Sequence, residues 1–297
     1  MLKHRLFFGT LMTVLFSVLV IVDGWMDGSL GGIEGAQKRV QGTLLCCMLC
    51  LVQIPAHLEL AGLAHLKGIK TPVAAALIAS MVLASGSYWQ QFLHLPHALL
   101  LAILAICFLA MVAQNYLKNG LEGMLANCGG GALSILYLGL LASFLMSIRI
   151  DFGLWPLVMT VFVVKSADIG AYTMGRACGR HKFAPRISPG KTWEGMLGAV
   201  LFGVIVSLIF ADLGEVMAWQ AAIKVMAWQA AVMFGICFAF IGQMGDLLES
   251  MMKRDAQLKD SSSRVPGFGG VLDIVDSPLV SAPFAYCFLS LSSSLAP

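Results

Sequence analysis

The chain contains nine long apolar segments, and this repetition constrains its fold more than any other feature. Each segment has about 17 to 20 residues, the length with which an α-helix crosses the hydrocarbon core of a bilayer. The sequence therefore predicts an all-α, polytopic integral membrane protein with about nine transmembrane helices. The segments lie at roughly residues 6–22, 41–57, 71–88, 97–115, 130–149, 153–170, 193–212, 228–246 and 277–294.

The composition agrees with a membrane protein and argues against two other classes. Hydrophobic residues make up 59% of the chain and charged residues 12%, whereas a soluble protein is about 25% charged. A net charge of only +3 gives no basis for a nucleic-acid-binding surface. The first apolar run, 6–22, is long for a signal peptide and no small-residue cleavage site follows it. We interpret it as a retained helix.

The distribution of basic residues predicts how the chain is oriented. If the N-terminus is cytoplasmic, most of the 19 lysines and arginines fall in inside segments, as the positive-inside rule requires. Both charged loops, 171–192 and 247–276, then lie on the cytoplasmic side, where nucleotides are available. We expect two regions: residues 1–150 with transmembrane helices 1–5, and residues 151–297 with the catalytic loops.

Residues 246–277 gather acids, bases and glycines between two apolar segments. Charge at such a position is costly, so the cluster is a functional-site candidate. Asp246 still lies within an apolar run and would need a cation or a proton as partner. Asp273 and Asp276 would share one helix face, where they repel each other unless a cation lies between them. These three carboxylates could supply the oxygen ligands that a divalent ion prefers.

Other polar residues of the chain have structural interpretations as well as functional ones. Glu249 and Lys253 are expected to form a pair at a solvated helix end. Ser188, Lys191 and Thr192 open an apolar segment and could form an anion site at a helix N-terminus, but the full glycine pattern of a P-loop is missing. A zinc site at Cys46 and Cys50 would lack further ligands.

The spacing of the charged motifs resembles the signature of the CDP-diacylglycerol synthase family, also called phosphatidate cytidylyltransferases. The matching residues are Ser250, Lys253, Arg254, Lys259, Asp260, Pro266, Gly267, Gly269, Gly270, Asp273 and Asp276. An upstream block, SADIGAY followed by SPGKTWEG, resembles a second region of the family. The resemblance covers about residues 165–280, and the N-terminal half is similar only in being a series of membrane helices.

The resemblance implies that CTP and phosphatidate react to give CDP-diacylglycerol and pyrophosphate. It implies Mg²⁺ on Asp246, Asp273 and Asp276, with room for a second cation, in an enzyme of the inner cell membrane whose site faces the cytoplasm. A homodimer is expected on the same ground. Phosphate contacts are assigned to Lys253, Arg254 and Lys259, and Asp260 either orients Lys259 or contacts the metal. Substrate contacts are assigned to Asp168, Ser188, Lys191, Thr192, Gly267, Gly269 and Gly270.

Two departures from the family pattern keep other interpretations open. Phe268 stands where a histidine is common and Ile274 where an arginine is common. They motivate an inactive homologue as one alternative. A nucleotidyltransferase or kinase acting on another lipid is a second, because the residues that would contact the lipid tails are generic apolar ones. A transporter is a third, because Lys165, Asp168 and Asp246 could form an ion path, but concentration of charge on one face argues against it. The paired-aspartate motif of a CDP-alcohol phosphotransferase is absent.

Overall fold

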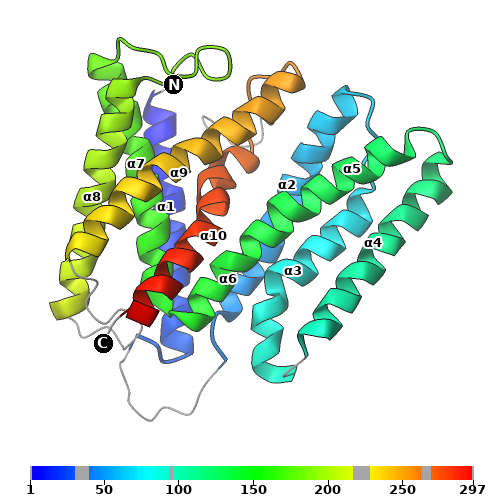
Figure 1. Cartoon of the computed structure of the whole chain (residues 1–297), viewed down its shortest axis with the longest axis horizontal. Helices are drawn as coiled ribbons and strands as arrows, with labels where there is room; N and C mark the ends of the chain where they lie inside the picture. Colours follow the sequence, from blue (N-terminus) through cyan, green and yellow to red (C-terminus); the bar gives the residue numbers. More distant parts are fainter. Residues whose placement is uncertain (1, 31–39, 94–95, 217–227, 263–268, 296–297) are drawn as a thin grey trace.

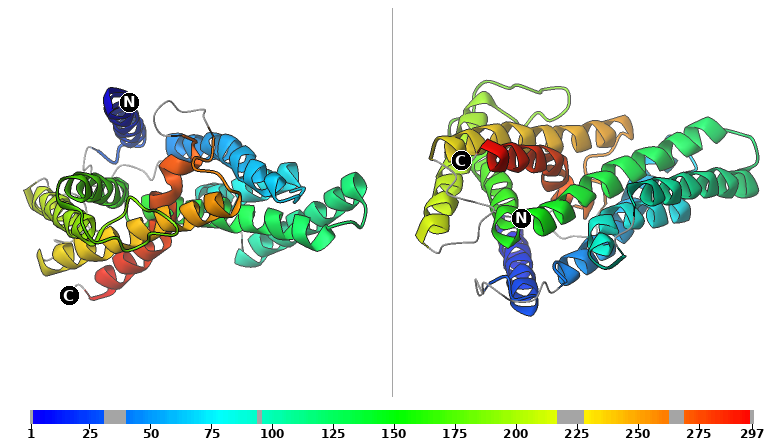
Figure 2. Two further views of the ribbon diagram at one scale, coloured as in Figure 1. Left: turned by 90° about the horizontal axis from the view of Figure 1, so that it is seen from above. Right: turned by 60° about the horizontal axis from the view of Figure 1, so that its bottom comes forward.

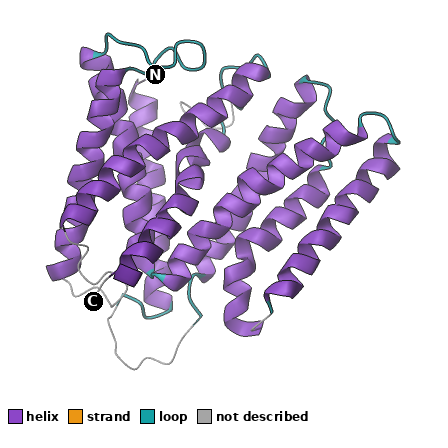
Figure 3. Cartoon of the chain, viewed as in Figure 1, coloured by secondary structure: helices purple, strands orange, loops and turns teal. Residues whose placement is uncertain are grey.

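The computed structural model describes residues 2–30, 40–93, 96–216, 228–262 and 269–295. Over these residues the chain forms helices and no β-strand (Figure 3). A π-helical turn, η1 (Ile135–Leu140), joins two of the helices into one continuous segment. The α-helices are α1 (Leu2–Met26), α2 (Thr43–Leu66), α3 (Val73–Leu93), α4 (His97–Asn119), α5 (Met124–Ser134), α6 (Leu141–Asp151), α7 (Leu154–Cys178), α8 (Trp193–Val216), α9 (Trp228–Asp255) and α10 (Leu272–Leu295).

Eight helical segments are long and apolar enough to cross a membrane, so the prediction of an all-α polytopic membrane protein is confirmed. They correspond to the second through ninth predicted spans. The first predicted span lies in α1, whose described apolar stretch is the shorter Leu11–Met26. The count of nine spans and the cytoplasmic N-terminus therefore stay predictions.

The helices extend beyond the ends of the apolar runs. α2 continues through Pro55 to Leu66, and α7 and α9 continue to Cys178 and Asp255. The charged loops are consequently shorter than the sequence suggested, at residues 179–192 and 256–271. Apolarity marks only the part of a helix inside the hydrocarbon, whereas backbone hydrogen bonding carries the helix on into the polar region.

The helices are arranged in three groups across the molecule. In Figure 1, α7, α8 and α9 lie on one side, α3, α4 and α5 on the other, and α2, α6 and α10 between them. The views in Figure 2 show the same separation, with α4 and α5 farthest from α8. The C-terminal end of α9 and the loop 179–192 both lie at the top of Figure 1, so the two charged loops share one end of the molecule.

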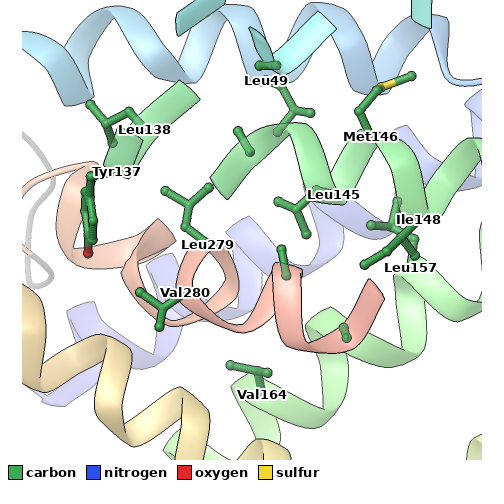
Figure 4. Close-up of a cluster of buried hydrophobic side chains, with 14 of the residues drawn as sticks. Leu49, Tyr137, Leu138, Leu145, Met146, Ile148, Leu157, Val164, Leu279 and Val280 are labelled. Carbon is green, nitrogen blue, oxygen red and sulfur yellow. The ribbon is translucent and has the colours of Figure 1, made fainter. Parts of the chain in front are cut away.

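The hydrophobic core joins the middle group to its neighbours. Figure 4 shows Leu49 of α2, Leu145 of α6, Leu279 of α10 and Val164 of α7 around one buried region. Close helix crossings depend on small residues, as is common in membranes. A Cβ on Gly170 of α7 would lie 2.3 Å from the carbonyl oxygen of Gly198 in α8, so both positions need glycine.

A buried ion cluster fixes the end of the molecule opposite to the charged loops. The Arg149 guanidinium, at the end of α6, donates to Asp23 at 3.1 Å and also to Asp27, both in the last part of α1 or just after it. Asp23 in turn accepts a hydrogen bond of 2.8 Å from the backbone N–H of Leu44. The cluster therefore ties α1, α2 and α6 together.

Candidate active site

Close packing of α9 on α10 brings two of the predicted aspartates together. A Cβ on Gly245 would lie 2.9 Å from the Cα of Ser277, so only glycine permits this approach. Ser277 then donates a hydrogen bond from its hydroxyl to Asp246. Its backbone N–H donates to the neighbouring Asp276 at 2.7 Å. Asp246 and Asp276 thus meet at one serine.

Two lysines from α7 and from the loop before α8 extend this cluster. The Lys191 ammonium donates to Asp246 at 3.2 Å and to the carbonyl of Gln243 at 2.9 Å. The Gln243 amide donates to Asp168 at 3.1 Å, and Asp168 pairs with Lys165 at 3.3 Å. These contacts join the predicted site residues Asp168, Lys191 and Asp246 into one continuous polar network.

Lys253 connects α9 to the start of α10. Its ammonium donates to Glu249 at 2.5 Å and also to Asp273. The predicted Glu249–Lys253 pair is confirmed, but its predicted solvation is wrong. Glu249 is only 2% exposed, because α10 and the loop before it cover this end of α9. A buried pair of this kind is sensitive to the loss of either partner.

Asp273 binds Lys253 and also holds the glycine-rich loop, the segment before α10 that contains Gly269 and Gly270. Its Oδ2 accepts hydrogen bonds from the Ser261 hydroxyl at 2.6 Å and from the Gly270 N–H at 2.7 Å. Gly269 has φ of +102°, a conformation that favours glycine. A Cβ on Gly270 would lie 2.0 Å from the Ser261 hydroxyl. The two glycines are therefore needed for the loop to close on Asp273.

Glu59 of α2 holds the same loop from the other side, and sequence reasoning did not find it. It is 4% exposed and accepts hydrogen bonds from the N–H groups of Val271 and Leu272 at 3.1 and 2.9 Å. The Ser262 hydroxyl donates to it at 2.8 Å, and that of Ser261 at 3.3 Å. A carboxylate at the first N–H groups of α10 also complements the positive end of the helix dipole.

Three other predicted residues stabilise the charged loops through hydrogen bonds. Thr192 accepts a hydrogen bond from the Gly195 N–H at 3.1 Å, so this buried side chain caps α8. Arg254 donates to the carbonyl oxygens of Ile187 and Leu258 at 3.1 and 3.0 Å, which joins the two loops. Ser188 accepts at its carbonyl from the Lys191 N–H at 3.1 Å, in the turn that places Lys191.

The other predicted positions lie nearby or outside the described residues. Lys259 and Asp260 are exposed in the loop after α9. Ile274, one of the two departures, is half-buried in the first turn of α10. Pro266, Gly267 and Phe268 fall outside the described residues, so the phosphate role predicted for Gly267 and the effect of Phe268 stay predictions.

With all of its groups ionised, the formal charge of this cluster is negative by two. Its five carboxylates meet three lysines, and Asp276 is close enough to Asp246, Glu249 and Asp168 for their charges to interact. An excess of this size fits a divalent cation, whose preferred ligands are carboxylate oxygens. The carboxylates are those of Asp168, Asp246, Glu249, Asp273 and Asp276, and the lysines are Lys165, Lys191 and Lys253.

The ligand set for such a cation is not assembled in the described conformation. Among the described residues, no three acidic, histidine or cysteine side chains form a group that could hold a metal ion. Asp273 is engaged by Lys253 and the glycine-rich loop, while Asp246 and Asp276 share Ser277. The predicted three-aspartate site therefore stays a prediction, and Asp246 with Asp276 is the pair that fits it best.

Tyr137 of the π-helical turn is a further group that sequence reasoning missed. Its side chain lies beside the first turns of α10 (Figure 4), within range of the charges of Asp276 and Glu249. Its hydroxyl is buried and has no hydrogen-bond partner in the part of the chain that the structure describes.

Of the two site residues that sequence reasoning missed, Glu59 did have a sequence signal, because it is the only acidic residue in the apolar helix α2. Tyr137 gave no such signal.

Comparison with known proteins identifies the family of the chain. Residues 36–292 match the cytidylyltransferase family. The phosphatidate cytidylyltransferase of Bacillus subtilis is 29% identical over 298 residues, which cover 98% of this chain and 99% of that protein. That of Staphylococcus epidermidis is 31% identical over 249 residues, covering 82% and 88%. That of Haemophilus influenzae is 38% identical over 132 residues, but this region is only 44% of either protein. The chain belongs to the cytidylyltransferase family.

Proposed function

We propose that this protein transfers the cytidylyl group of CTP to phosphatidate, giving CDP-diacylglycerol and pyrophosphate. Membership of the cytidylyltransferase family and likeness to phosphatidate cytidylyltransferases along almost the whole chain support the reaction. The observation that carries it is the network of lysines and carboxylates around Asp246, which is built from α7, α9, α10 and the loop 179–192.

The chemistry needs the kinds of group that this network contains. An oxygen of the lipid phosphate attacks the α-phosphorus of CTP, and the bond to pyrophosphate breaks. The nucleophile is already ionised, so the main barrier is to bring two anions together and to stabilise the leaving group. Lys191 and Lys253 lie at the cluster and can transfer hydrogen bonds from carboxylates to phosphate oxygens. Positioning and electrostatics then supply most of the rate.

Mg²⁺ is the cofactor that we propose, with Asp246 and Asp276 as the residues that would hold it. The excess of two negative charges at the cluster supports this choice. When bound, the ion would neutralise phosphate charge and polarise the phosphoryl oxygens. Asp273 would act from the neighbouring position by keeping Lys253 and the glycine-rich loop in place.

The position of the network supports a proposal for the membrane placement. The network lies near the middle of α7, in the second half of α9 and in the first turns of α10, and the charged loops follow α7 and precede α10. A lipid phosphate and a soluble nucleotide could both reach that depth. We propose that this end faces the cytoplasm, that the membrane is the inner cell membrane, and that a homodimer forms.

The test is an assay with phosphatidate and radiolabelled CTP as substrates. It measures the Mg²⁺-dependent transfer of the label into a lipid product that is extracted into organic solvent. Asp246→Asn should lower the turnover by about 10²- to 10³-fold, the cost of removing one group that stabilises transition-state charge. Glu122→Gln is the matched control, because Glu122 is an exposed carboxylate in the turn before α5. It should keep wild-type turnover.

Each outcome of this assay is informative. No product from folded wild-type protein, with several lipid phosphates tried, would refute the proposed reaction. Equal product from wild type and Asp246→Asn would keep the reaction but remove Asp246 from the site. Activity that persists in EDTA and does not respond to added Mg²⁺ would refute the metal.

A further inference from the structure

A cavity of about 710 Å³ lies between the C-terminal ends of α2 and α4 and the start of α3. The carboxylate network of the proposed active site does not contribute to it. Its walls combine apolar side chains, such as Ile69, Val73 and Leu77, with polar side chains of all three segments. Its volume is within the range of sites that bind small molecules, about 300–1,000 Å³.

The charge of the cavity wall is entirely basic. Lys70 and Lys118 line it together with His65, and none of its lining residues is acidic. Neither lysine forms an ion pair within the described part of the chain, whereas nearby Lys67 pairs with Asp255 at 3.0 Å. Lys70 and Lys118 are therefore free to bind an anion.

The Asn115 Nδ2 and the Thr71 hydroxyl, both in the wall, lack a hydrogen-bond partner in the part of the chain that the structure describes. Asn115 is 0% exposed, and its Oδ1 accepts a hydrogen bond of 2.8 Å from Asn119. Its Nδ2 has no hydrogen-bond partner among the described residues, and the buried Thr71 hydroxyl has none there either. A buried donor without an acceptor costs about 1–3 kcal/mol, so these groups point to a ligand that supplies acceptor oxygens.

The start of α3 adds a third kind of anion-binding group. Thr71 and Pro72 lead directly into α3, whose first turn lines the cavity through Val73 and Ala74. The N-terminus of a helix carries the positive end of its dipole. The Val73 and Ala75 N–H groups already donate to the Thr71 carbonyl at 2.9 Å and to Gln114 Oε1 at 3.0 Å, so the dipole is the contribution of this helix end. The free lysines and the unpartnered donor of Asn115 therefore lie at the same place as this helix end.

We propose that this cavity binds a phosphate group, carried by an anionic membrane phospholipid, at a site separate from the catalytic network. Phosphate offers acceptor oxygens to Asn115 and Thr71 and charge to Lys70 and Lys118. The apolar wall at Val73 and Leu77 favours a lipid over a free ion, because it would remain in contact with acyl chains. The bound lipid would link α4, which packs only at the edge of the helix array, to α2 and α3.

The experiment measures lipid binding to the purified full-length protein by native mass spectrometry in a neutral detergent. Phosphatidylglycerol is the probe, diacylglycerol is the control lipid without phosphate, and inorganic phosphate is a competitor. The test variant is Lys70→Gln with Lys118→Gln, and Lys67→Gln is the matched lysine control. Melting temperatures of all variants establish that they are folded.

The double variant should bind phosphatidylglycerol about tenfold or more weakly than wild type, since two charge-assisted contacts are lost. Lys67→Gln should bind it as wild type does, and diacylglycerol should not distinguish the proteins. Asn115→Asp, which adds a negative charge to the wall, should also weaken binding.

Other outcomes identify the source of the phosphate or overturn the proposal. If inorganic phosphate binds the site and phosphatidylglycerol does not displace it, the cavity binds phosphate but the proposal of a phospholipid ligand is overturned. Equal phosphatidylglycerol affinity for wild type, the folded double variant and Asn115→Asp would overturn the site itself.

Discussion

Replacing Glu59 with glutamine tests how the glycine-rich loop is held. Each carboxylate oxygen of Glu59 accepts one backbone N–H of the first turn of α10, from Val271 or Leu272, and one serine hydroxyl. Glutamine keeps the size of the side chain but has only one acceptor oxygen. In either orientation of the amide, its NH₂ group faces one of the two backbone N–H donors.

The cost of this change can be worked from the contacts. One buried N–H without an acceptor costs about 1–3 kcal/mol. Loss of the negative charge at the N-terminus of α10 removes about 0.3–1 kcal/mol more. The sum is about 1.3–4 kcal/mol, and it acts on the docking of the loop, because the hydrogen-bond partners of Glu59 are the two serines of the loop and the first N–H groups of α10.

Hydrogen exchange of the Val271 and Leu272 amides measures that docking directly. Since 1.4 kcal/mol corresponds to a factor of ten, exchange at these amides should become about 10- to 700-fold faster in Glu59→Gln. The specific activity should fall at least about tenfold, because Asp273 and Lys253 depend on the same loop. Ser262→Ala, which removes one neutral donor, should cost only about 1 kcal/mol.

Unchanged exchange at both amides in Glu59→Gln would refute this account of the loop. Faster exchange with unchanged specific activity would keep the structural role of Glu59 and show that the loop does not position the reacting groups. Exposed Glu122, changed to glutamine, controls for the general effect of removing a negative charge.

Three further predictions concern packing and charge elsewhere in the molecule. Gly270→Ala would place a Cβ 2.0 Å from the Ser261 hydroxyl, so specific activity should fall about tenfold or more, whereas Gly129→Ala, with open space around it, should keep wild-type activity. Arg149→Met should lower stability by about 3–5 kcal/mol in thermal or denaturant unfolding, since it leaves Asp23 and Asp27 buried without a cation, and adding Asp23→Asn and Asp27→Asn should recover most of the loss. Asp255→Asn removes only an exposed ion pair with Lys67, so the free energy of unfolding should change by less than about 1 kcal/mol. A larger change would contradict the surface character of that pair.

The membrane helices could be predicted from sequence, but their ends could not. A run of apolar residues reports the part of a helix in the hydrocarbon, and eight such runs correspond to membrane-length helices. The same signal stops at residue 246 in α9, although the helix continues to Asp255. The charged residues beyond it continue the helix, because Lys253 pairs with Glu249 on the same helix and with Asp273 at the start of α10.

The site residues could be predicted from the sequence where they are charged residues next to apolar runs. The role of a residue could not be predicted where it depends on tertiary contacts. Asp246, Asp273 and Lys253 stand out as charges beside apolar runs, and the structure places all three in or next to one network. Thr192 looked like a phosphate ligand, but its hydroxyl caps α8. Both roles use a hydroxyl at a helix start, so the local sequence does not separate them.

Glu59 shows why a local motif is an incomplete description of this site. The motif accounts for the glycines of the loop, but Gly270 is required partly because Glu59, more than two hundred positions earlier, occupies the space where a Cβ would be. The closest contact of such a Cβ with Glu59 would be 2.3 Å, to a carboxylate oxygen. The N-terminal region therefore contributes to the shape of the proposed site, although the sequence resemblance was confined to residues 165–280.

Helix packing, rather than loop sequence alone, sets the positions of the charged groups. Asp246 reaches Ser277 because Gly245 allows α9 and α10 to approach, and Asp273 reaches the loop because Gly270 leaves room for Ser261. An added methyl group at either glycine would separate an aspartate from its serine hydrogen-bond donor without changing any charge. Because buried carboxylates lose much of their solvation, such a separation costs more here than at a surface. The glycines next to the acids are thus as much a part of the electrostatics of the site as the acids themselves.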